Sequence, residues 1–191
     1  MQKSEILVKR LSVFSTFFAA QRRSGGSEWL KIKGSKMVRG FWIRSFRTED
    51  MEDILRVENS SFRRFAYDSK LFAEYAGARE SLFLVAGRGR RVCGYAIART
   101  RQGAHRHAAE LVSIAVEPLA RGQGVASLLL ENTFRCLELR GIRRVSLTVR
   151  AGNRRAQALY RRFGFRRERI VPGYYEDGAD GLRMAATLRN W

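Results

Sequence analysis

The stretch "AELVSIAVEPLARGQGVASLLLENTF" (Ala109 to Phe134) joins an alternating apolar segment to a glycine-rich basic turn and then to a row of leucines. The alternation predicts a half-buried strand, and apolar residues at Ala126, Leu130 and Phe134 predict a helix. Gly141 is placed to end that helix. A strand that enters a helix through Gly-x-Gly is typical of mixed α/β folds, and it brings the start of a helix to the end of a strand.

The turn is a candidate anion site because the first backbone N–H groups of a helix have no intrahelical acceptor and lie at the positive end of its dipole. Gly124 and Ala126 leave those N–H groups uncovered by large side chains. A pyrophosphate could bind there, with Arg121 adding positive charge. The alternative is a strand-to-helix turn whose glycines only supply a positive φ.

The rest of the chain predicts one mixed α/β domain in the order β-α-α-β-β-β-α-β-α-β-β, with no internal repeat. Thr48 and Asn153 are expected to cap helices, and glycines at 77, 141 and 164 are expected to end them. The expected strands are residues 41–46, 81–87, 91–100, 109–116, 143–149, about 165–171 and about 181–188, and the expected helices are 48–62, 68–78, 123–140 and 153–163.

Composition indicates a globular protein, since 45% of the 191 residues are hydrophobic. The two cysteines, Cys93 and Cys136, lie in apolar runs without a paired spacing, so we expect buried thiols and a cytoplasmic location. The two histidines, His105 and His107, have no cysteine near them in the sequence. We therefore predict no metal site.

The net charge of +19 favours attraction to nucleic acid, ribosomes or other acidic surfaces. Residues 1–40 contain nine Lys and Arg against two Glu, and five of the six lysines. We therefore expect a poorly ordered basic extension over residues 1–38 and a folded domain over 39–191. The apolar run Leu11 to Ala20 resembles the core of a signal peptide, but it is too short to span a bilayer, and Met37 is an alternative start.

A family resemblance sharpens these expectations. The pattern Arg-x-x-Gly-x-Ala (Arg121 to Ala126) after "IAVEP" resembles the acetyl-CoA motif of the GNAT superfamily of N-acetyltransferases. The resemblance continues through "VRAGNRRAQALYRRFGF" and "GYYEDGADGLRMA", and it covers about Phe41 to Leu188. It implies the GNAT (acyl-CoA N-acyltransferase) fold: a mixed central sheet of about seven strands with flanking helices, in which a splayed strand pair binds acetyl-CoA. The Tyr-Tyr-x-Asp-Gly-x-Asp loop is similar to that of the ribosomal-protein-alanine and protein N-terminal acetyltransferases.

The resemblance also implies which residues contact the ligands. Asn153 would lie near the pantetheine and Tyr160 near the sulfur, and their spacing of seven residues puts both on one helix face. The alternative for Tyr160 is a core aromatic. Tyr174 and Tyr175 would contact the acceptor. The backbone would pair with the pantetheine at Ile114, Ala115 and Val116, and would hold the pyrophosphate at Arg121, Gly122, Gln123, Gly124, Val125, Ala126 and Ser127.

Acetyl transfer to an amine needs a neutral amine, an aligned carbonyl and a proton donor for the leaving thiolate. The family resemblance makes Tyr160 the donor. Bacterial relatives carry a base in the motif "LEVR", but this chain has "LTVR", and the Thr148 hydroxyl cannot accept a proton usefully near neutral pH. Glu110 occupies a position that resembles the base of the histone-acetylating branch, and strand alternation predicts it on one face with Ile114 and Val116. The alternative for Glu110 is a strand-end carboxylate paired with an arginine.

The pKa of an α-amine is about 7.7–8.0 and that of lysine about 10.4, so near neutral pH far more α-amine is uncharged. The expected reaction is therefore acetylation of a protein or peptide N-terminus, of which a ribosomal protein is one example. Arginine pairs at 143–144, 154–155, 161–162 and 166–167 suggest RNA contact through a basic surface. The alternatives are a small amine, an antibiotic or aminoacyl-tRNA as acceptor, and a non-enzymatic acyl-CoA-binding or RNA-binding module.

Overall fold

The computed structural model describes residues 40–101 and 107–188, so the expected extension over 1–38 and His105 lie outside it. Within these ranges, seven strands form one mixed sheet in the order β1-β2-β3-β4-β5-β7-β6, as the predicted fold requires. The order of strands and α-helices along the chain confirms the prediction. The elements are β1 (Phe41–Ser45), η1 (Thr48–Asp50), α2 (Met51–Phe62), η2 (Arg63–Phe65), α3 (Ser69–Gly77), β2 (Ser81–Arg88), β3 (Arg91–Thr100), β4 (Ala108–Val116), η4 (Pro118–Ala120), α4 (Val125–Leu139), β5 (Arg144–Arg150), α5 (Arg154–Arg162), β6 (Arg166–Val171) and β7 (Gly181–Thr187).

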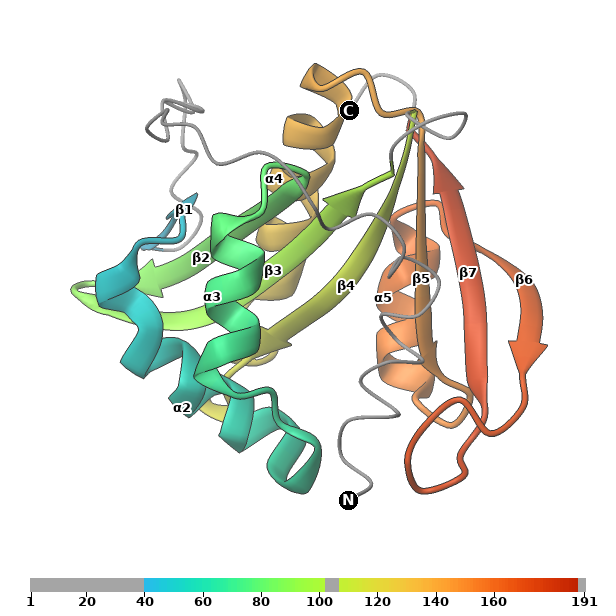
Figure 1. The fold of residues 1–191 in the computed structure, drawn as a ribbon, viewed down its shortest axis with the longest axis horizontal. Helices are drawn as coiled ribbons and strands as arrows, with labels where there is room; N and C mark the ends of the chain where they lie inside the picture. Colours follow the sequence, from blue (N-terminus) through green and yellow to red (C-terminus); the bar gives the residue numbers. More distant parts are fainter. Residues whose placement is uncertain (1–39, 102–106, 189–191) are drawn as a thin grey trace.

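The sheet lies between two layers of helices, with α2 and α3 on one face and α4 and α5 on the other (Figure 1). Each face has its own hydrophobic core. Leu130, Phe134 and Phe165 belong to the core under α4 and α5, and Val57 and Phe72 belong to the core under α2 and α3. No helix in the described parts of the chain is long and apolar enough to cross a membrane.

Strands β4 and β5 are the splayed pair (Figure 1). They pair in parallel only over Ala108–Glu110 and Arg144–Ser146, and they diverge beyond those residues. On its other side, β4 stays paired with β3 as far as the register Val116–Gly94. The sheet therefore opens between β4 and β5 while both strands stay anchored to their outer neighbours, which leaves a gap through its centre.

A β-bulge in β4 changes the predicted side-chain directions. Ala98 pairs with Leu111, but the preceding residue, Ile97, pairs with Ser113, so Val112 is an extra residue. An extra residue reverses the alternation beyond it. Glu110 consequently faces the α2 and α3 layer, whereas Ile114 packs against the opposite core. The prediction that Glu110 shares a face with Ile114 and Val116 was wrong, because alternation was assumed to be uninterrupted.

The two predicted helix caps have different outcomes. Asn153 caps α5 as predicted, and its Oδ1 accepts a hydrogen bond from the Ala156 N–H at 3.0 Å. Thr48 instead lies inside the turn η1, and α2 begins at Met51. The Asp50 carboxylate fixes the start of this segment by accepting a hydrogen bond from the Arg47 N–H at 2.8 Å. Asp50 thus bonds back to the residue before the turn, and its side chain makes no cap hydrogen bond to α2, so the hydroxyl cap predicted at Thr48 was wrong.

Candidate active site

A pocket of about 780 Å³ passes through the gap between β4 and β5, and side chains from both faces of the sheet line it. Five of the predicted site residues are in its lining: Ile114 from β4, Asn153 and Tyr160 from the α5 segment, and Tyr174 and Tyr175 from the β6–β7 loop. The splayed strands thus bring the expected cofactor residues and the expected acceptor residues to one cavity.

Tyr160 belongs both to the core and to the pocket wall. Its ring packs edge-to-face on Phe165, with the ring centroids 5.6 Å apart. Burial, with a smaller contribution from Tyr175, raises the pKa of the Tyr160 phenol well above its ordinary value. Tyr160 therefore keeps its proton throughout the physiological pH range, as a proton donor to a thiolate must.

The turn before α4 lies outside the lining of this pocket and presents the start of the helix to open space. Gly122 and Gly124 have φ of +79° and +88°, a region that favours glycine. A Cβ atom added at Gly124 would meet no atom within 4 Å. The Leu128 N–H donates to the Gly124 carbonyl at 3.0 Å, so the earlier N–H groups of α4 lack intrahelical acceptors. The glycines therefore supply the positive φ of the alternative interpretation, and the open space at the helix end is compatible with the anion site, which stays a prediction.

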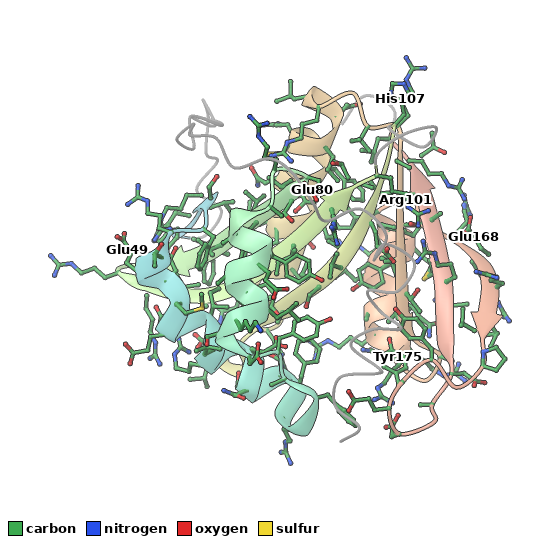
Figure 2. The ribbon with its side chains drawn as sticks, in the orientation of Figure 1. Glu49, Glu80, Arg101, His107, Glu168 and Tyr175 are labelled. Atoms are coloured by element: carbon green, nitrogen blue, oxygen red, sulfur yellow. The ribbon has the colours of Figure 1, made fainter. Side chains whose placement is uncertain are left out.

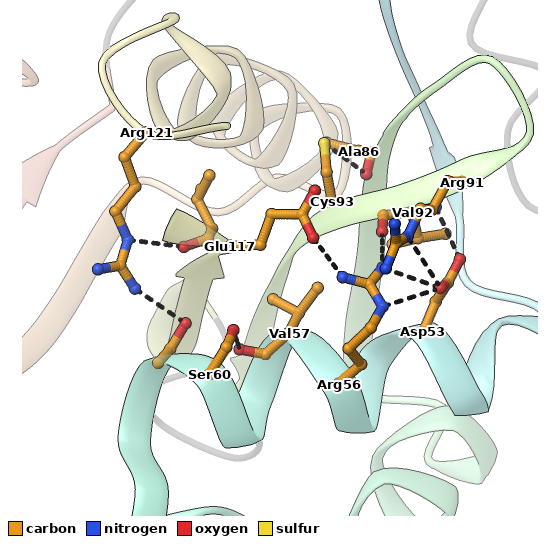
Figure 3. A network of polar contacts seen from close by, with 12 residues as sticks. Asp53, Arg56, Val57, Ser60, Ala86, Arg91, Val92, Cys93, Glu117 and Arg121 are labelled. Atoms are coloured by element: carbon orange, nitrogen blue, oxygen red, sulfur yellow. Dashed lines mark hydrogen bonds and ion pairs between the residues drawn. The ribbon is translucent and has the colours of Figure 1, made fainter. Parts of the chain in front are cut away.

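Arg121 connects this turn to two neighbouring elements (Figure 3). Its Nε donates to the Val116 carbonyl at 2.9 Å, and its Nη2 donates to the Ser61 hydroxyl at 3.2 Å. The guanidinium charge is thereby held between β4 and α2, beside the start of α4.

Helix α2 is fixed against the β3–β4 side of the sheet by a second polar network (Figure 3). The Arg56 guanidinium donates to the Asp53 carboxylate at 2.9 Å and to the Val92 carbonyl at 2.7 Å, and it pairs with Glu117. The Asp53 carboxylate accepts the Val92 N–H at 2.8 Å. The network thereby ties α2 to the start of β3 and to Glu117, which follows β4.

Glu110 is not part of the pocket lining. Its carboxylate accepts a hydrogen bond from Arg183 Nη1 at 2.6 Å, which is the ion pair that the sequence offered as the alternative. The same Arg183 nitrogen lies 3.3 Å from the Thr148 hydroxyl, and Nη2 donates to Ser146 at 2.8 Å. Thr148 does line the pocket, so the Arg183 guanidinium lies beside the pocket wall at this residue.

The β6–β7 loop carries the predicted acceptor residues, and Figure 2 shows Tyr175 on that side of the molecule. The Arg150 guanidinium lies 4.2 Å from the Tyr175 ring centroid and 5.3 Å from that of Phe65. Arg150 also pairs with Asp177 at 2.9 Å. Arg150 therefore links the loop to the segment after α2, so two distant parts of the chain form one aromatic wall.

Glu58 is a pocket residue that the sequence analysis did not single out. It is 1% exposed and lines the pocket from α2. A signal was available: Glu58 follows Ile54 by four residues, so an acid stands in the apolar stripe of the helix. An acid at such a position is unusual enough to mark a candidate site.

No group of three or more metal-binding side chains is present in the described ranges. The ring of His107, the one histidine within them, has its Nδ1 3.0 Å from the Gly141 carbonyl.

Comparison with known proteins identifies relatives of this fold and site. Residues 48–165 match the family described as "Acetyltransferase (GNAT) family". The [ribosomal protein bS18]-alanine N-acetyltransferase of Escherichia coli K12 is 33% identical over 149 residues, which are 76% of this chain and 97% of that protein. An N-alpha-acetyltransferase of Sulfolobus acidocaldarius is 32% identical over 163 residues, 81% of this chain and 96% of that protein. The crystal structure of the ribosomal-protein-S18-alanine N-acetyltransferase from Escherichia coli matches with a TM-score of 0.70 and 30% identity, covering 79% of this chain and 96% of that one.

Proposed function

The chain belongs to the acetyltransferase (GNAT) family and is an N-acetyltransferase, and from that premise we propose that its acceptor is the N-terminal α-amine of a protein. The observation that carries the proposal is the single pocket in which Asn153 and Tyr160 meet Tyr174 and Tyr175. The names of the relatives support the same acceptor class, and a ribosomal protein is one candidate. A cytoplasmic location is part of this proposal.

The residues present fit acetyl-CoA, which supplies the activated acetyl thioester. The open space at Gly124 leaves room for a pyrophosphate at the N–H groups from Gly122 to Ser127. The Arg121 N–H, which the sequence placed in the same set, donates instead to the Pro118 carbonyl at 3.3 Å. Where β5 has diverged, the backbone of β4 at Ile114, Ala115 and Val116 has one edge without a neighbouring described strand, and this edge would pair with the amide groups of the pantetheine. Asn153 lies at the cap of α5 and would meet the same arm.

Tyr160 would donate its proton to the leaving thiolate. Its buried, protonated phenol suits this role because a donor must still carry its proton when the carbon–sulfur bond breaks. Glu110 could act as the base only if its carboxylate left Arg183. An α-amine reduces the demand on any base, since about a tenth of α-amines are already neutral near pH 7.

We also propose that the exposed arginines of α5 and β6 favour acceptors bound to RNA, as ribosomal proteins are. Arg154, Arg155 and Arg162 are exposed on α5, and Arg166 and Arg167 are exposed on β6. Such positive charge attracts nucleic acid in a salt-dependent manner.

A panel of acceptors tests the function. We expect acetyl-CoA turnover with peptides that begin with a free α-amine, and little turnover with the same peptides blocked at the N-terminus. Release of CoA with each acceptor is the measurement. The panel includes a peptide whose only amine is a lysine, a small polyamine, an aminoglycoside and an aminoacyl-tRNA. If one of these acceptors is acetylated faster than every α-amine peptide, the proposed acceptor is wrong and that acceptor class takes its place. If none of the acceptors is acetylated, the binding-module alternative is favoured.

A further inference from the structure

Glu58 is a buried carboxylate on the wall of the active-site pocket. One carboxylate oxygen accepts the Tyr67 N–H at 2.9 Å, and the other is bound by the Tyr95 hydroxyl. Burial of a charged group costs free energy, which hydrogen bonds offset only in part. A glutamate in the apolar stripe of α2 that also lines the substrate cavity therefore calls for a role beyond packing.

The partners of Tyr95 show which groups accept hydrogen bonds at this wall. Burial, followed by the charge of Glu58, raises the pKa of Tyr95 well above its ordinary value, so its hydroxyl stays protonated. This hydroxyl donates a hydrogen bond to Glu58. The same hydroxyl oxygen is 3.0 Å from the Ser113 hydroxyl. Since a phenol has one proton, Ser113 must be the donor in that contact. Glu58 and the oxygen of Ser113 are thus both acceptors, and both line the pocket.

This arrangement has a definite chemical preference. A protonated amine carries three N–H donors and a positive charge, and it matches a carboxylate beside a hydroxyl oxygen. We infer that Glu58, assisted by Ser113, binds the protonated α-amine of the acceptor and removes its proton. This inference rests on the proposed transfer to an α-amine, and it names the form in which that amine is recognised.

The proposed step balances as follows. The carboxylate of Glu58 takes one proton from the ammonium group, and the neutral nitrogen forms a bond to the thioester carbonyl carbon. The carbon–sulfur bond then breaks, and the electron pair leaves with sulfur. Tyr160 protonates the sulfur and regains a proton from the acylated nitrogen, so one hydrogen stays on the amide. Glu58 releases its proton to solvent.

The other two candidate bases are worse placed. Arg183 holds the Glu110 carboxylate, which lies outside the pocket lining. Thr148 lines the pocket but has no useful basicity. Glu58 lines the pocket, and the Tyr67 N–H and the Tyr95 hydroxyl orient its side chain there.

Glu58→Gln tests the inference in the full chain with a peptide that begins with alanine. We expect kcat/KM near neutral pH to fall by about 10²–10⁴-fold, the range for loss of a general base. The loss should shrink above the pKa of the α-amine, about 7.7–8.0, because the amine then needs no base. Glu80→Gln is the matched control, since Glu80 pairs with Arg99 away from Tyr175 (Figure 2) and should leave the rate unchanged.

A binding measurement separates recognition from packing. In the presence of CoA, the wild-type protein should bind the alanyl peptide roughly tenfold or more tightly than a propionyl peptide that lacks only the amine, because a charge-assisted hydrogen bond is lost. Glu58→Gln should remove this difference. If it weakens both peptides equally, or keeps full activity while Glu110→Gln loses it, the inference is wrong.

Ser113→Ala keeps the inference testable if Glu58→Gln does not fold. It removes the second acceptor from β4, a strand that already contains alanine at 108, 109 and 115. We expect a smaller but definite loss of the preference for the alanyl peptide. An unchanged preference would contradict the inference. If the wild-type protein acetylates no α-amine, both the proposed function and this role of Glu58 are wrong. If the wild-type protein acetylates α-amines and only the variants lose the preference for the alanyl peptide, the result tests the role of Glu58 and Ser113 alone.

Discussion

Tyr160→Phe is expected to lower kcat by about 10²–10⁴-fold, because the thiolate must then leave without a proton donor. The ring contact with Phe165 survives in the variant, so the fold and the shape of the pocket should not change. CoA affinity should change little, since the phenol acts on the departing sulfur and not on the bound nucleotide. Single-turnover rates at saturating acetyl-CoA and peptide, combined with CoA binding by calorimetry, measure both quantities.

The matched control for this variant is Tyr75→Phe on α3, which removes a phenol hydroxyl outside the pocket lining. It should leave kcat unchanged. Full activity of Tyr160→Phe would mean that water or another group protonates the thiolate, and a parallel loss of CoA affinity would mean that Tyr160 serves binding instead of proton transfer.

Gly124→Val is expected to abolish the stabilisation of the protein by CoA. At a CoA concentration of about 100 Kd, binding to the folded state contributes about 2.7 kcal/mol, a rise in Tm on the order of 5–10 °C for a chain of this size. In the variant, the valine side chain would enter the open space before α4 and cover its N–H groups. Thermal unfolding with and without CoA gives the shift directly.

Positive φ makes valine strained at this position whatever the ligand does, at a cost of order 1–3 kcal/mol. Gly141→Val controls for that strain, because Gly141 has φ of +74° at the opposite end of the same helix and also faces open space. Both variants should have a lower Tm without ligand, but only Gly124→Val should lose the CoA-dependent rise. An equal rise in both would show that the pyrophosphate does not bind at this turn.

Local signals in the sequence predicted most of the fold. The helices and their order could be predicted because the signals that define them involve only neighbouring residues. Examples are the spacing of Leu130 and Phe134, the cap at Asn153 and the glycine at 141. The bulge at Val112 could not be predicted from the sequence. One inserted residue leaves the apolar alternation of β4 unchanged in the sequence, but it reverses the faces of the sheet to which the following side chains point.

The candidate site was predictable where it depends on one element, and less so where distant elements meet. Asn153 and Tyr160 share a helix face, and both line the pocket. The pairing of Glu110 with Arg183 joins residues far apart in a chain rich in arginine, so no local pattern could select that partner. Glu58 was visible as an acid in an apolar stripe, but its proximity to Tyr95 and Ser113 depends on how α2 packs across the sheet.

A peptide that carries both a free N-terminal alanine and an internal lysine tests directly whether the protein transfers acetyl to an α-amine. After incubation with acetyl-CoA near neutral pH, fragmentation mass spectrometry locates the acetyl group. We expect one acetyl group on the α-nitrogen and an unmodified lysine, and Tyr160→Phe should reduce the amount of this product. Acetyl on the lysine side chain with a free N-terminus, or an unmodified peptide beside rapid acetylation of a small amine, would contradict this expectation.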